Sequence, residues 1–168
     1  FITGNDGEGN NGCGIWNNGA TLNVINSTIA GNYASRSGGG LYGSGTIKNS
    51  IIWGNTNVSG WAGPQINGST TITYSDIGQS GYAGSNGNIN SDPLFVDFLQ
   101  ADIDTPTAGG DFHIMSGSPA VNTSNNSDAP ADDIESQARP LNVGDPADMG
   151  ADEYLSLEAE APVVTAFT

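Results

Sequence analysis

The chain has 168 residues and a net charge of −15, with 25 glycines, eight prolines and only 12% charged residues. A chain of this length can bury a core without disulfides or a metal, and its composition indicates closely spaced turns rather than long helices. An acidic surface repels nucleic-acid phosphates and anionic lipids, so we expect neither as a partner. The single Cys13 excludes an internal disulfide and a cysteine-based zinc site, and no apolar run approaches the roughly 20 residues that span a bilayer.

The charge is concentrated in the second half of the chain. Residues 1–90 hold three acids and two bases, whereas residues 91–168 hold 15 acids and a single base, Arg139. Cations are therefore the expected counter-charge of the second half.

A repeat sets the predicted elements of the first 90 residues. Residues 2–5 match the end of a repeat unit, so we interpret Phe1 as lying inside a longer protein. Later copies cover residues 14–32, 41–55 and 66–77, and equivalent positions recur after 23 to 27 residues. The spacing varies while the pattern persists, which places the insertions in loops between fixed strands.

Within each copy, apolar residues alternate with polar ones, as at Leu22 and Val24, which is typical of strands with one buried face. At roughly 3.3 Å per residue, three short strands and their turns account for one closed coil of this length. A leucine-rich repeat has a similar period, but its leucine spacing and helical return segment are absent. The repeat therefore predicts a β-solenoid of stacked parallel strands.

Stacking aligns equivalent side chains into columns. We expect buried columns of Ile29, Ile52 and Ile77, of Ile15, Leu41 and Ile66, and of Ile47 and Ile72. Asn26 and Asn49 align at a turn, where stacked amides hydrogen-bond along the axis, and Tyr74 ends that column.

Beyond about residue 90 the repeat is lost, and residues 91–154 are rich in Asp and Pro. Because a solenoid must hide its last open coil, we predict that this acidic region caps the stack. Residues 155–168 are expected to form a linker toward a following domain.

Two groups of residues resemble known families. Gly38-Gly39-Gly40-Leu41-Tyr42 and Asn49-Ser50-Ile51-Ile52-Trp53-Gly54-Asn55 resemble repeats of pectate-lyase-like proteins. Ser91-Asp92-Pro93-Leu94-Phe95, Gly117-Ser118-Pro119-Ala120 and Asp148-Met149-Gly150-Ala151-Asp152-Glu153-Tyr154, in this order, resemble the C-terminal region of bacterial surface proteins known as choice-of-anchor Q domain proteins. The resemblance covers residues 1–154 and implies an all-β fold, a right-handed parallel β-helix (β-solenoid) with an irregular C-terminal cap, in an extracellular or cell-surface protein.

The β-helix families include polysaccharide lyases and glycoside hydrolases, so catalysis is an alternative. A lyase needs clustered carboxylates for Ca²⁺ and a basic side chain, and an inverting hydrolase needs two carboxylates roughly 6.5 to 9.5 Å apart. The coils contain few acids and bases, and the outward column of Asp76 otherwise holds Thr28 and Ile51. We therefore expect no catalytic residue in this chain, with an active site, if one exists, largely in coils outside it.

Trp16 and Tyr42 align in one outward column and are the candidate glycan-binding residues, because exposed aromatics on a flat β-face can stack on sugar rings. Stacking between coils would explain both residues without a ligand. A polysaccharide is the expected partner under the first interpretation.

Six aspartates in turn-rich segments are candidate ligands of a structural Ca²⁺ ion, namely Asp97, Asp102, Asp104, Asp128, Asp132 and Asp133. Solvated acidic loops are the alternative, and no other cofactor is expected. His113, the only histidine, has no partner at a recognisable spacing and is interpreted as an ordinary position. Arg139 is predicted to make a structural ion pair or carbonyl hydrogen bonds, with Asp152 or Glu153 as its first partners.

These observations predict a structural or adhesive segment of a secreted or cell-surface protein, such as a stalk, a filament or a glycan-binding rod. Self-association through the coil ends is expected, because an exposed parallel strand edge is a template for further strands.

Overall fold

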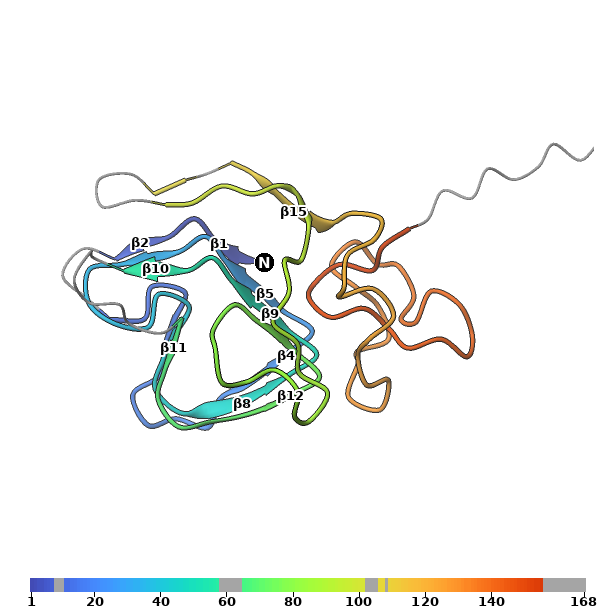
Figure 1. The fold of residues 1–168 in the computed structure, drawn as a ribbon, viewed down its shortest axis with the longest axis horizontal. Coiled ribbons are helices and arrows are strands. Elements are labelled where there is room, and N and C mark those ends of the chain that lie inside the picture. The colour runs from blue at the N-terminus through green and yellow to red at the C-terminus, as the bar shows by residue number, and fades with distance from the viewer. Residues whose placement is uncertain (8–10, 58–64, 102–105, 108, 156–168) are drawn as a thin grey trace, which may run out of the picture.

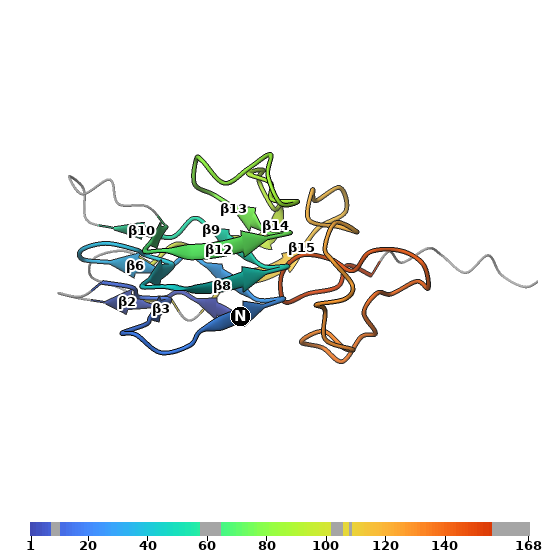
Figure 2. The same cartoon turned by 90° about the horizontal axis from the view of Figure 1, so that it is seen from below.

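The computed structural model describes residues 1–7, 11–57, 65–101, 106–107 and 109–155. These residues contain no helix, and their strands are short. Thirteen of the strands form four parallel sheets. Each of three passes of the chain adds one strand to every sheet, and the start of a fourth pass adds one more strand to a single sheet. The layers lie above one another in Figure 2, and Figure 1 looks along the stack. This all-β arrangement of stacked parallel strands is compatible with the predicted β-solenoid.

The sheets are named here A to D. Sheet A contains β1 (Ile2–Thr3), β5 (Thr28–Ala30), β9 (Ile51–Trp53) and β13 (Asp76–Ile77), and sheet B contains β2 (Asp6–Gly7), β6 (Tyr33–Ala34) and β10 (Thr56–Asn57). Sheet C contains β3 (Ile15–Trp16), β7 (Leu41–Tyr42) and β11 (Ile66–Asn67), and sheet D contains β4 (Asn23–Ile25), β8 (Gly45–Lys48) and β12 (Thr70–Thr73).

The predicted apolar columns are confirmed by the strand register. Ile29 pairs with Ile52, which pairs with Ile77, and all three side chains are fully buried. The columns of Ile15, Leu41 and Ile66 and of Ile47 and Ile72 are also in register, the latter extended by Val24. Burial of an aliphatic side chain contributes roughly 1.5 to 3 kcal/mol, so these columns are the main apolar stabilisation of the stack.

A second column consists of amide side chains between sheets A and B, exposed at Asn5 and buried at Asn32, Asn55 and Gln65. Asn5 donates to Asn32 Oδ1 at 2.7 Å, Asn32 to Asn55 Oδ1 at 2.8 Å, and Asn55 to Gln65 Oε1 at 3.1 Å. Each amide oxygen also accepts the backbone N–H of the layer before it, at 3.0 to 3.1 Å. The preceding glycine of each turn has a φ of 60 to 65°, a conformation that glycine adopts without steric cost.

The turn between sheets D and A contains the predicted Asn26–Asn49 column. Both residues have positive φ, as does Tyr74 in the next layer, and asparagine tolerates this conformation better than most residues. Asn49 donates to Asn26 Oδ1 at 3.1 Å. The column therefore forms as expected and loses its amide at Tyr74.

The last layer of the stack is closed by residues 78–90. Ile77 donates its N–H to Ile89 O at 3.0 Å, Tyr74 to Asn86 O at 2.9 Å, and Asn88 donates its side chain to Ile72 O at 2.9 Å. Figure 2 shows this segment lying over β12 and β13. The end of the stack is thus capped by residues 78–90, and not by the acidic region 91–154 for which this role was predicted.

Residues 91–155, called here the C-terminal region, lie along the side of the stack instead of across its end (Figures 1 and 2). Its two strands, β14 (Phe95–Asp97) and β15 (Asp111–Ile114), form an antiparallel pair. The outer face of sheet A and this region share a second apolar core, which includes Ala30, Ile51, Phe95, Phe112, Ile114, Ala120 and Met149. Because sheet A offers an apolar outer face, covering that face takes precedence over capping the end.

Candidate functional site

The candidate glycan-binding residues lie next to each other on sheet C. Trp16 pairs with Tyr42 in the parallel register, and Asn67 continues the column. Trp16 is 65% exposed, and Tyr42 is half-buried. In the described part of the chain, the aromatic ring contacts all involve Phe1, Phe95, Phe98, Phe112 or His113, and none joins Trp16 to Tyr42. The indole therefore presents its surface to solvent rather than to the next coil.

The adjoining sheet D extends this face with short neutral side chains. Asn23, Thr46 and Thr71 form one register column, and they alternate with the buried column of Val24, Ile47 and Ile72. Figure 1 shows sheets C and D as neighbouring sides of the stack. The outward side of sheet D also carries Ile25 and Lys48, but the column nearest sheet C is polar and neutral. One exposed indole beside neutral polar side chains suits stacking on a ring and hydrogen bonding to hydroxyl groups.

The acids and bases of the coils do not form a paired catalytic arrangement among the described residues. Lys48 contacts Asp128 Oδ1 at 2.6 Å, so its ammonium serves to hold the C-terminal region. Asp76 lies in the Thr28–Ile51 column, as expected, but it is completely buried rather than exposed. Glu8 lies outside the described residues.

The burial of Asp76 has a direct electrostatic consequence. Its Oδ1 accepts the N–H of Ser91 at 3.1 Å, while Oδ2 is buried without a hydrogen bond. Burial raises the pKa of Asp76 to about 7, opposed by the Ser91 hydrogen bond and supported by the charge of Asp92. An acid that is buried alone in this way is a titrating structural group, not half of a carboxylate pair.

Four of the six predicted calcium ligands lie in described residues, and these four do not form a cluster. Asp97 and Asp132 are exposed, Asp128 pairs with Lys48, and Asp102 and Asp104 lie outside the described residues. Asp133 makes turn contacts, because its Oδ1 accepts the N–H groups of Glu135 and Gln137 at 2.8 Å and its Oδ2 accepts that of Glu153 at 3.0 Å. None of these four belongs to the one cluster of three ligand-type side chains found in the described part of the chain.

Arg139 is the centre of a buried charge network, as predicted. Its guanidinium donates to Asp148 O at 3.2 Å and Gly150 O at 3.1 Å, and it lies 3.6 Å from Glu153 Oε2. Burial raises the pKa of Asp148 to about 6, although hydrogen bonds from Asn122 and Tyr154 oppose the shift. Of the two expected carboxylate partners, Glu153 makes the contact and Asp152 faces elsewhere.

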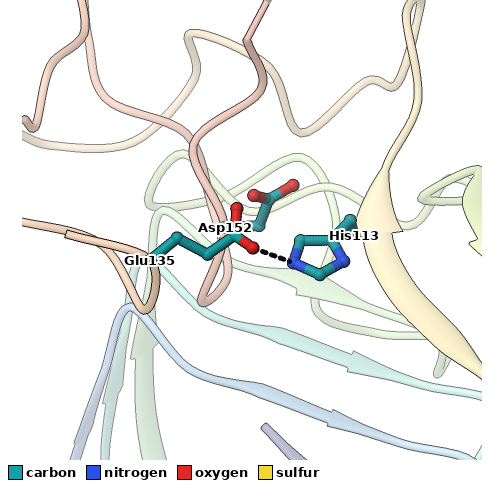
Figure 3. Close-up of side chains that lie close together, drawn as sticks. All are labelled: His113, Glu135 and Asp152. Atoms are coloured by element: carbon teal, nitrogen blue, oxygen red, sulfur yellow. Dashed lines mark ion pairs between the residues drawn. The ribbon is translucent and has the colours of Figure 1, made fainter. Parts of the chain in front are cut away.

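Asp152 instead lies beside His113 and Glu135, and these three side chains form the ligand-type cluster (Figure 3). Their ligand atoms lie within 4.8 Å of one another. Asp152 Oδ2 accepts the N–H of Ile114 at 3.0 Å, and His113 Nε2 lies 3.4 Å from Glu135 Oε1. Asp152 is buried, His113 is half-buried and Glu135 is exposed. The cluster therefore extends from the protein interior at Asp152 to the surface at Glu135.

The opposite nitrogen of the histidine ring is held by Asp111. His113 Nδ1 contacts Asp111 Oδ1, and the same oxygen accepts the His113 N–H at 3.1 Å. Burial alone lowers the pKa of His113, but the Asp111 hydrogen bond and the charges of Asp152, Asp111 and Glu135 outweigh it and raise the pKa above its usual value. The imidazole is thus fixed in one orientation, with Nε2 directed at two carboxylates.

Sequence reasoning treats His113 as an ordinary position and therefore misses this cluster. Asp111, two residues earlier on the same face of a strand, was a local signal for one of its neighbours. Glu135 and Asp152 come from distant loops, and no spacing marks them as partners of His113.

Comparisons with known proteins give no relative for this chain: no family model, curated protein or solved structure matches it. Among the described residues, no helix has the length and apolar character needed to cross a membrane.

Proposed function

We propose that this chain is a structural and adhesive segment of a secreted or cell-surface protein, which displays a neutral glycan-binding face carrying Trp16 and Tyr42. The observation that carries the proposal is the 65% exposed indole of Trp16 in the neutral column that it forms with Tyr42 and Asn67 on sheet C. An exposed indole costs solubility and adds nothing to the core, whereas stacking on a sugar ring would bury it.

The stack supports this role because it is stiff and because its described residues show no paired acids and bases. Parallel strands and buried amide columns connect each layer to the next, so binding groups on one face keep a fixed spacing. The strand connections are proposed to be right-handed, as in the pectate-lyase-like families, since parallel crossovers within one sheet are right-handed in roughly 98% of cases.

The ligand class follows from the charge of the chain. With a net charge of −15, the protein repels uronate-rich polymers, and neutral polysaccharides fit the polar face better. Structural Ca²⁺ at some of Asp97, Asp102, Asp104, Asp128, Asp132 and Asp133 remains a separate proposal. A melting temperature that is equal in millimolar Ca²⁺ and in excess chelator would contradict it.

The test is retention of the protein by a panel of neutral and acidic polysaccharides in affinity electrophoresis. Trp16→Ala is expected to abolish retention by the neutral polymers, Trp16→Phe to weaken it, and neither to change the melting temperature. Val143→Ala is the matched control, because it also removes an exposed apolar side chain, but from the C-terminal region.

Absence of retention on every polymer would contradict the glycan-binding part of the proposal. The alternative, a polysaccharide lyase or glycoside hydrolase, is tested in the same samples by assay of new unsaturated or reducing ends. Product formed by this chain would contradict the non-catalytic role.

A further inference from the structure

We propose that His113, Glu135 and Asp152 form a binding site for one divalent transition-metal ion of the Zn²⁺ type. The site would join β15 to the two loops that carry Glu135 and Asp152 (Figure 3). It is independent of the glycan-binding face and involves none of the predicted calcium ligands.

The first argument is the donor set. One imidazole nitrogen and two carboxylates match the three-ligand sites that zinc occupies in proteins. Two ligand atoms at about 2.0 to 2.2 Å from a tetrahedral zinc ion are roughly 3.3 to 3.6 Å apart. His113 Nε2 and Glu135 Oε1 already lie 3.4 Å apart, and all three ligand atoms lie within 4.8 Å of one another.

The second argument is the state of the histidine ring. Nε2 has no exposed surface and makes no hydrogen bond, and its nearest charged neighbour is Glu135 Oε1 at 3.4 Å. A buried ring nitrogen without a hydrogen bond is unfavourable, and metal coordination would satisfy it.

The third argument is the support around the ligands. Metal-binding histidines commonly donate their second N–H to a carboxylate, and Asp111 accepts from His113 Nδ1 in this way. Asp152 is 5% exposed and is oriented by the Ile114 N–H, while Asp133 accepts the N–H of Glu135 and so fixes the start of its loop. Three ligands are thus presented by separate segments, each with its own orienting contact.

The choice of metal follows from ligand chemistry. Ca²⁺ requires six to eight oxygen ligands, whereas imidazole favours Zn²⁺ and its first-row neighbours. The surrounding charge favours any cation, because residues 91–168 hold 15 acids and one arginine. A metal ion here would add a cross-link in a region whose described residues contain two short strands.

The test uses the fact that His113 is the only histidine of the chain. Zn²⁺ is titrated into ¹⁵N-labelled, chelator-treated protein near pH 7.5, and the two ring nitrogens are followed by long-range ¹H–¹⁵N NMR. The expected result is a shift of Nε2 that saturates at one equivalent, with Nδ1 still protonated. Millimolar Ca²⁺ should leave both resonances in place.

Calorimetry with variants measures the contribution of each group. Glu135→Gln should weaken Zn²⁺ binding at least tenfold, and Asp111→Asn should weaken it about 10- to 100-fold through the orientation of the ring. Asp145→Asn, an exposed acid of the same region, should change affinity less than twofold. Cys13→Ser should also leave affinity unchanged, which separates this site from the lone thiol.

Two outcomes would overturn the proposal. Unchanged ring resonances in excess Zn²⁺ would leave the cluster as an imidazolium held by carboxylates. Equal affinity of the wild type and Glu135→Gln, or loss of binding in Cys13→Ser, would place any bound zinc elsewhere.

Discussion

The strand stack and the C-terminal region are stabilised by different kinds of polar contact. In the stack, one residue type repeats in a column, as with Asn5, Asn32 and Asn55, and each amide donates to one neighbour and accepts from the other. In the C-terminal region, the stabilising polar contacts are made by single groups that are not repeated, above all by Arg139 with Glu153.

Electrostatics explains this division. Neighbouring strands are about 4.8 Å apart, so a charge repeated in every layer would face its own copy, whereas an amide is complementary to itself. This accounts for the three acids of residues 1–90 against the 15 of residues 91–168. A repeated column spreads the effect of one mutation over similar contacts, while an unrepeated contact has no substitute.

The largest expected effect is therefore at Arg139. Arg139→Met removes the only guanidinium of the network and leaves Glu153 and Asp148 buried without a counter-charge, which should cost about 5 kcal/mol of unfolding free energy. Urea denaturation measures the loss, and hydrogen exchange should show it in the C-terminal region while stack amides stay protected.

Two further variants sharpen this comparison. Arg36→Met, the matched control in the stack, should stay within about 0.5 kcal/mol of the wild type. The double variant Arg139→Met/Glu153→Gln should recover part of the loss, because the unpaired charge is removed. Equal loss of protection in both regions would show that they unfold as one unit.

The second expected effect is a pH dependence at Asp76, where the two regions meet. Its pKa is raised to about 7 in the folded protein, so between about pH 4 and 7 the native state binds a proton that the unfolded state releases. The stabilisation is complete below pH 4 and is lost as the pH rises through 7, by on the order of 4 kcal/mol.

Asp76→Asn is the variant that isolates this contribution. Its unfolding free energy should fall less than that of the wild type between pH 4 and 8, with a residual slope because the pKa of Asp148 is also raised, to about 6. Denaturation at a series of pH values provides the measurement. Parallel curves for the two proteins would show that Asp76 titrates normally.

The third expected effect is in the repeated column. Asn32→Ala leaves the amide of Asn5, the carbonyl of Ile2 and Asn55 Oδ1 without one of their partners, which should cost about 2 to 3 kcal/mol. Asn18→Ala, at an exposed position, is the control and should cost less than about 0.5 kcal/mol. If Asn32→Ala lowered the unfolding free energy more than Arg139→Met does, the view that neighbouring amides of the column compensate for one lost member would be contradicted.

The same division decides what could be predicted from the sequence. A repeat states its own register, so the column of Ile29, Ile52 and Ile77 and the Asn26–Asn49 pair followed from the alignment of copies and are confirmed. The amide column of Asn5, Asn32 and Asn55 was visible as a recurring Gly-Asn, but the pattern does not say that the amides of Asn32 and Asn55 are buried.

The C-terminal region offers no such register. The burial of Asp76 depends on how the chain at Ser91 returns over sheet A, and the cluster at His113 depends on two loops whose geometry is set by single contacts such as those of Asp133. The alternation of apolar and polar residues correctly predicted the column in which Asp76 lies. It could not predict that Asp76 is buried, because the segment that covers it does not repeat and leaves no periodic signal in the sequence.

The smallest expected effect concerns the strand edge at the β1–β4 end of the stack. Within the described residues, these strands pair on one side only, whereas residues 78–90 cover the opposite end. We expect two copies to associate weakly through the edge of β4, because unpaired peptide groups are a template for another strand.

The sedimentation coefficient of the protein should then depend on its concentration. Ile25→Lys places a charge on this edge at a 41% exposed position and should weaken association about tenfold, with little change in stability. Ile134→Lys adds the same charge to the C-terminal region, at a 51% exposed position, and should leave association unchanged. A protein that sediments as a monomer at all concentrations, or an equal response to the two lysines, would mean that this edge is protected by its own short, twisted strands.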